Sequence, residues 1–335
     1  GCGGAAIYGT TNSDSISISN NILSGLTIGA MSYQASKSRG QETANTILLG
    51  GGNWNIEANL LRQMFDGIAA GATADSLASS ESDILDNTIM DCQDDAWQAD
   101  GSYDIGLLYA RNNSYRNGTG ASIAPVVVGP TYVLYNTIWN NRKEGIRLGS
   151  ASEGQVLIAH NTIGCSGGTA PAIWNPGGAH KRTVFRNNIF QSSTSGGAVV
   201  YNPVTGADTS GTYTNDFNYN CYDSLGTGGR LVEWKSGVRY SLASLRVNAA
   251  GFRWETAGIQ AAPVFRDTAA LDFATTSTTL RDAGVRLTGI NTRVMYDGTS
   301  PDIGRYAYQA VNVTPSTPSN KRLPWWKRLV NPHWR

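Results

Sequence analysis

Short apolar runs in which hydrophobic and polar residues alternate recur along the whole chain. Four of them are SISIS at 15–19, GLLYA at 106–110, TYVLY at 131–135 and QVLIA at 155–159. β-Branched and aromatic residues with a period of two predict short strands. A second apolar run follows after a break rich in Gly, Pro, Ser or Asp. Examples are AWQA at 96–99, GIRLG at 145–149 and AIWN at 172–175.

Asparagine returns at regular spacing directly after the strand-like runs. The positions are Asn20, Asn59, Asn87, Asn112, Asn136, Asn161, Asn187 and Asn218. Subtracting consecutive positions gives intervals of 39, 28, 25, 24, 25, 26 and 31 residues, so the four middle intervals are nearly constant. A repeat of this length indicates a solenoid, in which each unit stacks on the next.

Two solenoid classes fit a period near 25 residues, the leucine-rich repeat and the parallel β-helix. The spaced Leu-x-x-Leu-x-Leu consensus of leucine-rich repeats is absent. Two or three strands per unit instead favour an all-β fold, a parallel β-helix of single strands with about 24–26 residues per coil, as the middle intervals show.

The repeated asparagine has a structural role in such a fold. Asparagine tolerates left-handed backbone geometry at a tight corner, and its amide can bond to the asparagine of the coils above and below. We expect this ladder at Asn87, Asn112, Asn136, Asn161 and Asn187. We expect an inward aliphatic column two residues after the asparagines, at Ile22, Ile89, Ile138, Ile163 and Ile189.

Composition excludes some function classes. The net charge is +1 with 15% charged residues, so nothing indicates a nucleic-acid partner. No run of eighteen apolar residues exists, which predicts no transmembrane segment. The chain opens GCGGAAIYG without Met or leader features, so we expect a removed leader or an upstream region, and an extracellular or cell-surface location.

The chain divides into three parts. Residues 1–222 carry the coils, and residues 223–310 form the final coils and a C-terminal cap. Within that cap we expect a short hairpin followed by a helix at Ser241–Val247, and we expect DIGRY at 302–306 to cover the sheet edges. Residues 311–335 form a Thr/Ser/Pro linker and a tail with three tryptophans.

The tail differs in charge from the rest of the chain. Removing its five basic residues from the 26 in the chain leaves 21 against 25 acids, so the body carries −4 and the tail +5. Such a tail suits docking onto an acidic surface, whether a neighbouring subunit, a polyanionic glycan or a membrane interface.

The cysteines lie too far apart to pair. Cys92, Cys165 and Cys221 belong to coils two or three apart. At roughly 4.8 Å per coil they are separated by about 10 to 14 Å, beyond the roughly 7 Å Cα limit of a disulfide. We expect buried free thiols.

Several longer stretches carry a family resemblance. They are DDAWQADGS at 94–102, GPTYVLYNTIWNN at 129–141, HNTIG at 160–164, FRNNIF at 185–190, and LRDAGVRLTGIN with SPDIGRYAY within 280–308. In these the chain resembles bacterial right-handed parallel β-helix proteins of the pectin-lyase-like superfamily. The resemblance implies a right-handed coil. It implies no particular activity, because the superfamily includes lyases, glycosidases, epimerases, phage depolymerases and members without known activity.

Candidate binding residues lie on the second run of each unit. Aligning these runs on Trp97, Ile146 and Ile173 places Gln98, Arg147 and Trp174 in one outward column. An exposed Trp174 offers a stacking face for a sugar ring. The basic residues Arg142 and His180, in loops before strands, are further candidates for substrate binding.

Candidate catalytic residues surround that column. In a lyase acting on uronic acids, Arg147 would neutralise the carboxylate and Lys143 would remove the proton. Ca²⁺, the one cofactor that the sequence suggests, would use oxygen ligands from Asp94, Asp95, Asp100 and Glu144.

The sequence also carries arguments against both chemistries. The Lys and Arg of the lyases that the chain resembles lie one coil apart, whereas one coil beyond Lys143 the chain reads GGTAP, without a basic residue. Asp95 and Glu144 form a second column at the sheet edge, marginal in separation for a hydrolase. Gln98 stands where the resemblance suggests Glu, which argues against a hydrolase.

Two functions stay open, and the sequence does not decide whether the chain is an enzyme. The first is binding of an acidic polysaccharide along the exposed sheet, with lyase-like cleavage as an additional activity. The second is a structural or adhesive module of a filament, sheath or virion, which binds neighbouring copies through an open N-terminal end and the basic tail.

Overall fold

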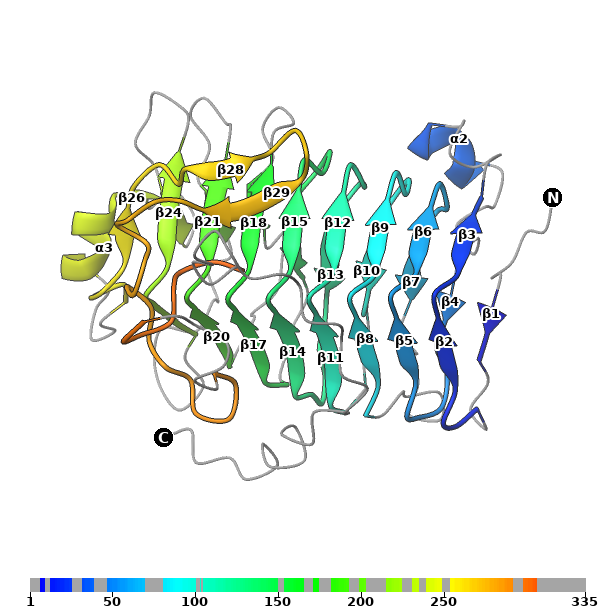
Figure 1. Ribbon diagram of the computed structural model, residues 1–335. Helices are drawn as coiled ribbons and strands as arrows, with labels where there is room; N and C mark the ends of the chain where they lie inside the picture. Colours follow the sequence, from blue (N-terminus) through cyan, green and yellow to red (C-terminus); the bar gives the residue numbers. More distant parts are fainter. Residues whose placement is uncertain are drawn as a thin grey trace.

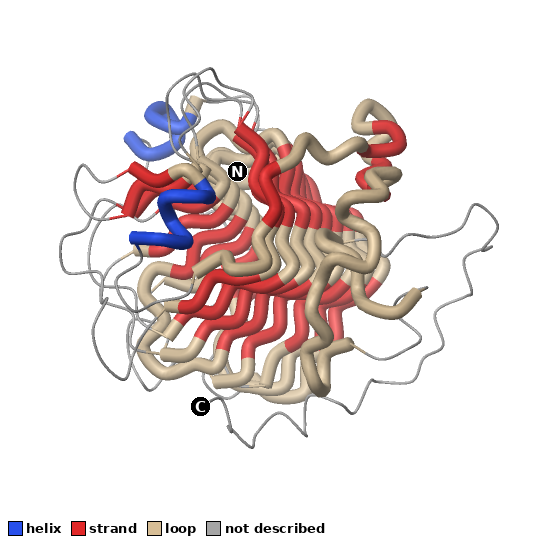
Figure 2. Tube along the Cα trace, turned by 90° about the vertical axis from the view of Figure 1, so that its left-hand side faces the viewer, coloured by secondary structure: helices blue, strands red, loops and turns tan. Residues whose placement is uncertain are grey.

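The computed structural model describes residues 7–9, 13–25, 32–38, 47–69, 81–100, 103, 105–149, 154–165, 171–174, 182–192, 199–202, 215–224, 231–234, 239–248, 254–291 and 298–305. These residues form a parallel β-solenoid, in which the chain visits three long sheets in turn, once per coil (Figure 1). Seen along the stack, the strands of each sheet lie in rows (Figure 2). The prediction of an all-β parallel solenoid is confirmed.

Sheet 1 carries the second apolar run of each unit. Its strands, in spatial order, are β1 (Ile7–Tyr8), β4 (Ile47–Leu48), β7 (Ile68–Ala69), β10 (Trp97–Gln98), β13 (Ala121–Ile123), β16 (Ile146–Leu148), β19 (Ile173–Trp174), β22 (Val200–Asn202), β25 (Val232–Trp234) and β26 (Arg239–Tyr240). All its pairs are parallel except β25 with β26.

Sheets 2 and 3 flank the asparagine corner. Sheet 2 consists of β2 (Ser17–Ser19), β5 (Asn55–Glu57), β8 (Asp83–Leu85), β11 (Leu107–Ala110), β14 (Thr131–Leu134), β17 (Val156–Ala159), β20 (Thr183–Arg186) and β23 (Asp216–Asn218). Sheet 3 consists of β3 (Ile22–Ser24), β6 (Leu60–Arg62), β9 (Thr88–Met90), β12 (Asn113–Tyr115), β15 (Thr137–Trp139), β18 (Thr162–Cys165), β21 (Ile189–Ser192), β24 (Cys221–Ser224) and β27 (Ile259–Gln260).

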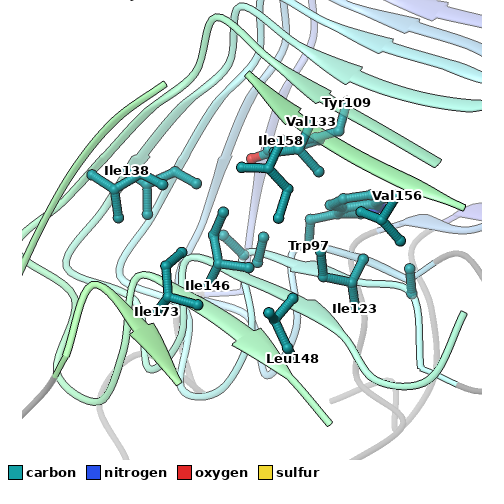
Figure 3. Packing of buried hydrophobic residues seen from close by; sticks show 14 of the residues in the cluster. Trp97, Tyr109, Ile123, Val133, Ile138, Ile146, Leu148, Val156, Ile158 and Ile173 are labelled. Carbon is teal, nitrogen blue, oxygen red and sulfur yellow. The ribbon is translucent and has the colours of Figure 1, made fainter. Parts of the chain in front are cut away.

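One apolar core fills the interior between the three sheets. Val133 and Ile158 of sheet 2 point across the interior toward Ile146 and Ile173 of sheet 1 (Figure 3). All four side chains are fully or almost fully buried. Because alternate residues of a strand point to opposite faces, each strand gives one side to this core and the other side to the outer surface.

Asparagine side chains form a continuous ladder between sheets 2 and 3. The Oδ1 of each asparagine accepts the backbone N–H and the Nδ2–H of the asparagine one coil before it. Asn112, for example, donates to Asn136 Oδ1 at 2.9 Å from its backbone N and at 3.2 Å from Nδ2. Its Nδ2 also donates to the carbonyl oxygen of Ile84 at 2.8 Å. No side-chain polar atom of Asn112 therefore lacks a partner.

The ladder runs through a different asparagine near each end than the sequence spacing suggests. Its described members are Asn21, Asn59, Asn87, Asn112, Asn136, Asn161, Asn188 and Asn220. The prediction of Asn187 is wrong by one residue, because Asn161 bonds to Asn188 Oδ1 at 3.0 Å. Asn20 and Asn218 are likewise displaced by Asn21 and Asn220.

The same shift changes the predicted inward column. Ile89, Ile138 and Ile163 are buried as expected. Ile22 is 70% exposed, so its predicted inward position is wrong, and Leu23 takes that register. Phe190, not Ile189, pairs with Ile163. Ile189 instead packs on the outside of sheet 3 against Leu280 and Ile303.

Left-handed backbone geometry falls on the residue before each ladder asparagine, not on the asparagine itself. The residues and their φ angles are Ala58 56°, Asp86 55°, Arg111 58°, Tyr135 56°, His160 56° and Asn187 56°. Positive φ is uncommon for residues other than glycine. The ladder hydrogen bonds therefore stabilise a corner that these residue types do not favour by themselves.

The two cysteines whose side chains are described are buried free thiols. Burial raises the pKa of Cys92 and of Cys221 to about 12. Cys92 also begins a second, shorter ladder that sequence reasoning missed. Its backbone N donates to Asn117 Oδ1, and the N of Asn117 donates to Asn141 Oδ1, both at 2.9 Å.

The coils are followed by the expected hairpin and helix. β25 and β26 pair antiparallel, and α3 (Leu242–Asn248) starts within one residue of the predicted helix. Within the described part of the chain, no helix is long and apolar enough to cross a membrane. The tail at 311–335 lies outside the described residues.

The closing segment does not lie where the sequence suggests. Instead of covering the sheet edges, residues 261–291 and 298–305 turn back over the outer faces of sheets 2 and 3 (Figure 1). The hairpin of β28 (Phe265–Asp267) and β29 (Asp272–Thr275) packs Phe265 and Phe273 against Trp139, with ring centroids 5.4 and 4.6 Å away. We call residues 261–291 together with 298–305 the strap.

The end of the strap reaches the middle coils. Arg305 donates from Nη2 to the carbonyl oxygen of Arg111 at 2.7 Å and from Nη1 to Thr137 Oγ1 at 2.8 Å. Asn291 Nδ2 donates to Tyr135 Oη at 2.6 Å and to His160 Nε2 at 2.9 Å. Burial lowers the pKa of His160 to about 4, so this imidazole is neutral at physiological pH.

Candidate functional site

The predicted outward column exists on sheet 1. Gln98 pairs with Ser122, Ser122 with Arg147, and Arg147 with Trp174. Gln98, Arg147 and Trp174 are each partly exposed. Ser122 belongs to the coil between Gln98 and Arg147 and was missed, because the NGTGASI stretch around it lacks the charged and aromatic residues that marked the other coils.

Arg147 and Trp174 contact each other within the column. The Arg147 guanidinium carbon lies 5.3 Å from the centroid of the Trp174 ring. A cation over an indole face is an attractive contact, and both groups remain partly accessible. The pair combines a positive charge with an aromatic surface, the two features that bind an anionic sugar.

A second column stands at the corner before sheet 1, and it contains acids. Asp66, Asp95, Thr119 and Glu144 occupy equivalent positions, each two residues before its strand of sheet 1. Asp95 donates its backbone N–H to Asp66 Oδ1 at 3.0 Å, and Thr119 donates to Glu144 Oε1 at 3.1 Å. We call these four residues, together with the adjacent Asp94 and Lys143, the acid corner.

The acids of this column are buried, whereas the sequence predicted outward positions for Asp95 and Glu144. Asp66 and Asp95 are each 2% exposed and Glu144 is 3% exposed. The carboxyl groups of Asp66 and Glu144 point along the stack, where each accepts a hydrogen bond from a neighbouring coil. Asp94 is the partly exposed acid of the corner.

Three carboxyl groups converge in the acid corner. One oxygen each from Asp66, Asp94 and Asp95 lies within 4.8 Å of the others. Oδ1 of Asp95 is buried without a hydrogen-bond partner. Of the four residues expected to hold Ca²⁺, only Asp94 and Asp95 belong to this cluster. Asp66 completes it and was not expected.

The other two predicted metal ligands point elsewhere. Asp100 Oδ1 accepts a hydrogen bond from Ser122 Oγ at 2.6 Å and one from the backbone N of Ala124 at 3.3 Å. Glu144 bonds to Thr119. Three carboxylate oxygens are a partial set of ligands for a hard cation such as Ca²⁺, which takes six to eight.

Burial controls the ionisation of this corner. Burial raises the pKa of Asp66 and of Asp95 well above the usual aspartate range, and the negative charge of Asp94 raises both further. Burial also raises the pKa of Glu144 and of Asp100, and the nearby Arg147 charge opposes both shifts. The corner therefore holds carboxyl groups that keep a proton at higher pH than ordinary aspartates do.

Lys143 is the cation of the acid corner. Its Nζ lies 2.7 Å from Asp94 Oδ1 and 4.0 Å from the ring centroid of Tyr33. Tyr33 belongs to α2 (Tyr33–Ser38), in the connection between β3 and β4. The sequence predicted Lys143 as a catalytic base, but this amine forms an ion pair with a carboxylate.

The Arg142 guanidinium donates hydrogen bonds to backbone carbonyl oxygens of neighbouring turns. Its Nη1 donates to the carbonyl oxygen of Arg116 at 2.8 Å, and its Nη2 donates to those of Cys92 and Gln93 at 2.6 and 3.0 Å. These bonds tie the turns of three coils together, so the guanidinium is engaged with the protein and not with the outward column. His180 lies outside the described residues.

Asp66 and Tyr33 are the residues of this site that sequence reasoning missed. A signal for Asp66 existed: it lies seven positions after the ladder residue Asn59, and Asp95 lies eight positions after Asn87. Tyr33 had no such signal, because its connection interrupts the repeat. Comparison with protein-family models, with curated proteins and with solved structures finds no match to this chain.

Proposed function

We propose that this protein binds an acidic polysaccharide along the outward column of sheet 1 and hydrolyses a glycosidic bond at the acid corner. The observation that carries the proposal is the position of three converging carboxyl groups beside a column with an exposed arginine and tryptophan. Arg147 would pair with a sugar carboxylate, and Trp174 would stack on a ring face.

The chemistry follows from the different environments of the three carboxyl groups. Asp66 and Asp95 are too buried to touch a glycosidic bond, so the protons that their raised pKa values retain would reach the leaving oxygen through the partly exposed Asp94. Asp94, beside Lys143, would donate this proton and then stabilise the developing cation as a carboxylate.

Hydrolysis is favoured over the lyase reaction that the sequence suggested. A lyase needs a base that is free to take a proton from the sugar, and Lys143 is engaged by Asp94 and by the Tyr33 ring. The argument against a hydrolase from Gln98 loses force because Asp66 supplies the additional acid. Right-handed coiling, pectin-lyase-like ancestry and an extracellular or cell-surface location are parts of the same proposal.

A glycan-array screen of the purified protein, with and without Ca²⁺, tests binding. We expect acidic glycans to bind, and we expect Trp174→Ala or Arg147→Ala to weaken binding about tenfold, by roughly 1–2 kcal/mol. Arg266→Ala, an exposed arginine on β28 outside sheet 1, is the matched control. Equal binding by all variants would remove the column from the proposal.

Assays of any bound glycan test the reaction. New reducing ends without ultraviolet absorbance indicate hydrolysis, whereas an absorbing unsaturated product indicates a lyase. Cleavage that requires Ca²⁺ would assign the acid corner to a metal ion. If no glycan binds, the proposal is wrong in full.

Self-assembly is a second candidate, because the first coil exposes apolar side chains. Tyr8 is 64% and Ile22 is 70% exposed on β1 and β3, which are edge strands of the described sheets. Exposed edges pair readily with other strands. Light scattering across a concentration series, compared with Ile22→Lys, tests this candidate. A monomer at every concentration would contradict it.

A further inference from the structure

The connection between β3 and β4 is the candidate for a further role in the site. In the next coils, the chain passes from sheet 3 to sheet 1 through short turns, such as residues 63–67 between β6 and β7. In the first coil the same corner contains residues 25–46, including α2. α2 lies near the N-terminal end of the stack (Figure 1), and its Tyr33 contacts Phe65 and also Lys143 of the acid corner.

Tyr33 links α2 to two later coils. Its ring stacks on Phe65, with centroids 5.8 Å apart and planes inclined by 24°. Phe65 is 3% exposed and directly precedes Asp66. Lys143 Nζ lies 4.0 Å from the Tyr33 ring centroid, and Lys37 Nζ donates to Tyr33 Oη at 3.2 Å. The ring therefore contacts both the buried Phe65 and the cation of the acid corner.

We propose that Tyr33 is a positioning residue that holds Lys143 on Asp94. A lysine side chain has four flexible torsions, and an exposed lysine loses about 2 kcal/mol of rotamer freedom when it is fixed. The ion pair alone is weak at a partly exposed position. A ring face at 4.0 Å adds a cation–π contact and restricts the ammonium to one side of the corner.

The position of Lys143 decides whether the three carboxyl groups have a cation beside them. While Lys143 stays on Asp94, a positive charge lies directly beside the three converging carboxyl groups. If Lys143 moved into solvent, no cation would offset the repulsion between the three adjacent carboxyl groups, and their ionisation would become less favourable. The inference rests on the proposed function for its catalytic meaning, but the position of Lys143 can be measured without any activity.

The direct test is the rate at which an acetylating reagent modifies Lys143, followed by mass spectrometry. A held ammonium reacts slowly, so we expect Tyr33→Ala to raise the rate several-fold relative to other lysines. Tyr33→Phe keeps the ring and should react like the original protein. Tyr33→Leu tests whether apolar packing on Phe65 is enough, and Tyr219→Ala, after β23 at the other end of the stack, is the control.

A structural role alone predicts a different outcome. If Tyr33 only stabilised the fold, Tyr33→Ala would lower Tm and raise the modification of many lysines together. An unchanged rate at Lys143 in Tyr33→Ala would overturn the inference.

The pH dependence of cleavage adds the catalytic readout. We expect Tyr33→Ala to change the pH profile of kcat while Tyr33→Phe retains it. If Lys143 becomes reactive in Tyr33→Ala but no variant, including the original protein, cleaves any glycan, the positioning role stands and the proposed function fails.

Discussion

The asparagine corner and the acid corner are built from the same coils and obey opposite rules. At the asparagine corner each amide offers a donor and an acceptor, so identical residues satisfy one another along the stack. At the acid corner, Asp66, Asp94 and Asp95 offer only acceptors when ionised, and stacking brings like charges together. Repetition stabilises the first corner and destabilises the second.

The asparagine corner serves the fold, whereas the acid corner carries groups that are suited to a chemical role. An ordered stack of amides needs no ligand, because every polar group finds its partner within the protein. A stack of acids with an unpartnered oxygen on Asp95 costs stability, and proteins accept such costs at functional sites. Substitutions that exchange an acid for an amide, or the reverse, test this distinction directly.

The largest effect is expected when an acid enters the asparagine corner. Asn136→Asp keeps the acceptor but removes the amide donor and buries a charge, so we expect a loss of about 3–5 kcal/mol in the free energy of unfolding at pH 7. The loss should shrink on acidification, because a protonated carboxyl regains a donor.

Urea unfolding at pH 7 and pH 5 measures this loss. The exposed Asn140→Asp introduces the same charge and should change stability by less than about 0.5 kcal/mol. Equal effects at the two positions would mean that the ladder contributes little.

The next effect is expected at Glu255, a buried acid at the end of the asparagine ladder. Glu255 ends the ladder by accepting from Asn220 Nδ2 and from Tyr222 Oη, both at 2.6 Å. Burial raises the pKa of Glu255 from 4.5 to about 7. Because the folded protein binds this proton more tightly, the stabilisation is complete below pH 4.5 and is lost as pH rises through about 7.

Glu255→Gln removes this pH dependence. We expect the variant to be more stable than the original protein by about 3 kcal/mol at pH 8, and no more stable at pH 4.5. Denaturant midpoints at both pH values measure the change. A stability gain that is the same at both would show that Glu255 does not titrate in this range.

The smallest stability effect is expected when an amide enters the acid corner. Asp95→Asn gives the unpartnered position a donor beside Asp66 and Asp94, so we expect a gain of about 1–2 kcal/mol at pH 7. The raised pKa of Asp95 means that the gain should disappear at low pH, where the carboxyl is protonated in both states.

Cleavage should respond in the opposite direction. If the proposed function is correct, Asp95→Asn loses at least about a hundredfold in kcat while it gains stability. Asp86→Asn, which breaks the exposed ion pair with Arg111, is the matched control and should lose about 0–1 kcal/mol with full activity. A destabilised Asp95→Asn would contradict the comparison between the corners.

The sequence predicted the parts of the molecule that repeat. The ladder from Asn87 to Asn161 was recognisable because each coil repeats the same hydrogen bonds and the same strand lengths. The error at Asn187 arose where FRNNIF offers two adjacent asparagines and only the strand register decides between them. The column of Gln98, Arg147 and Trp174 could be aligned for the same reason.

Non-repeating contacts could not be predicted. Burial of Asp95 and Glu144 depends on the turns that cover the corner, and no sequence period describes those turns. Tyr33 meets Lys143 across 110 positions of sequence, as their numbers show, and Arg305 meets Arg111 across 194. Such contacts depend on how a connection folds back, which local patterns do not encode.

The strap has a consequence for how the protein unfolds. In a simple solenoid each coil contacts only its neighbours, so coils can open one after another from an end. Arg305 and Asn291 of the strap instead form hydrogen bonds to the middle coils, more than a hundred positions earlier in the sequence. Opening a middle coil therefore also releases the strap, and the strap cannot dock before those coils have formed. A fold built as a linear array of units thereby acquires the all-or-none cooperativity of a globular domain.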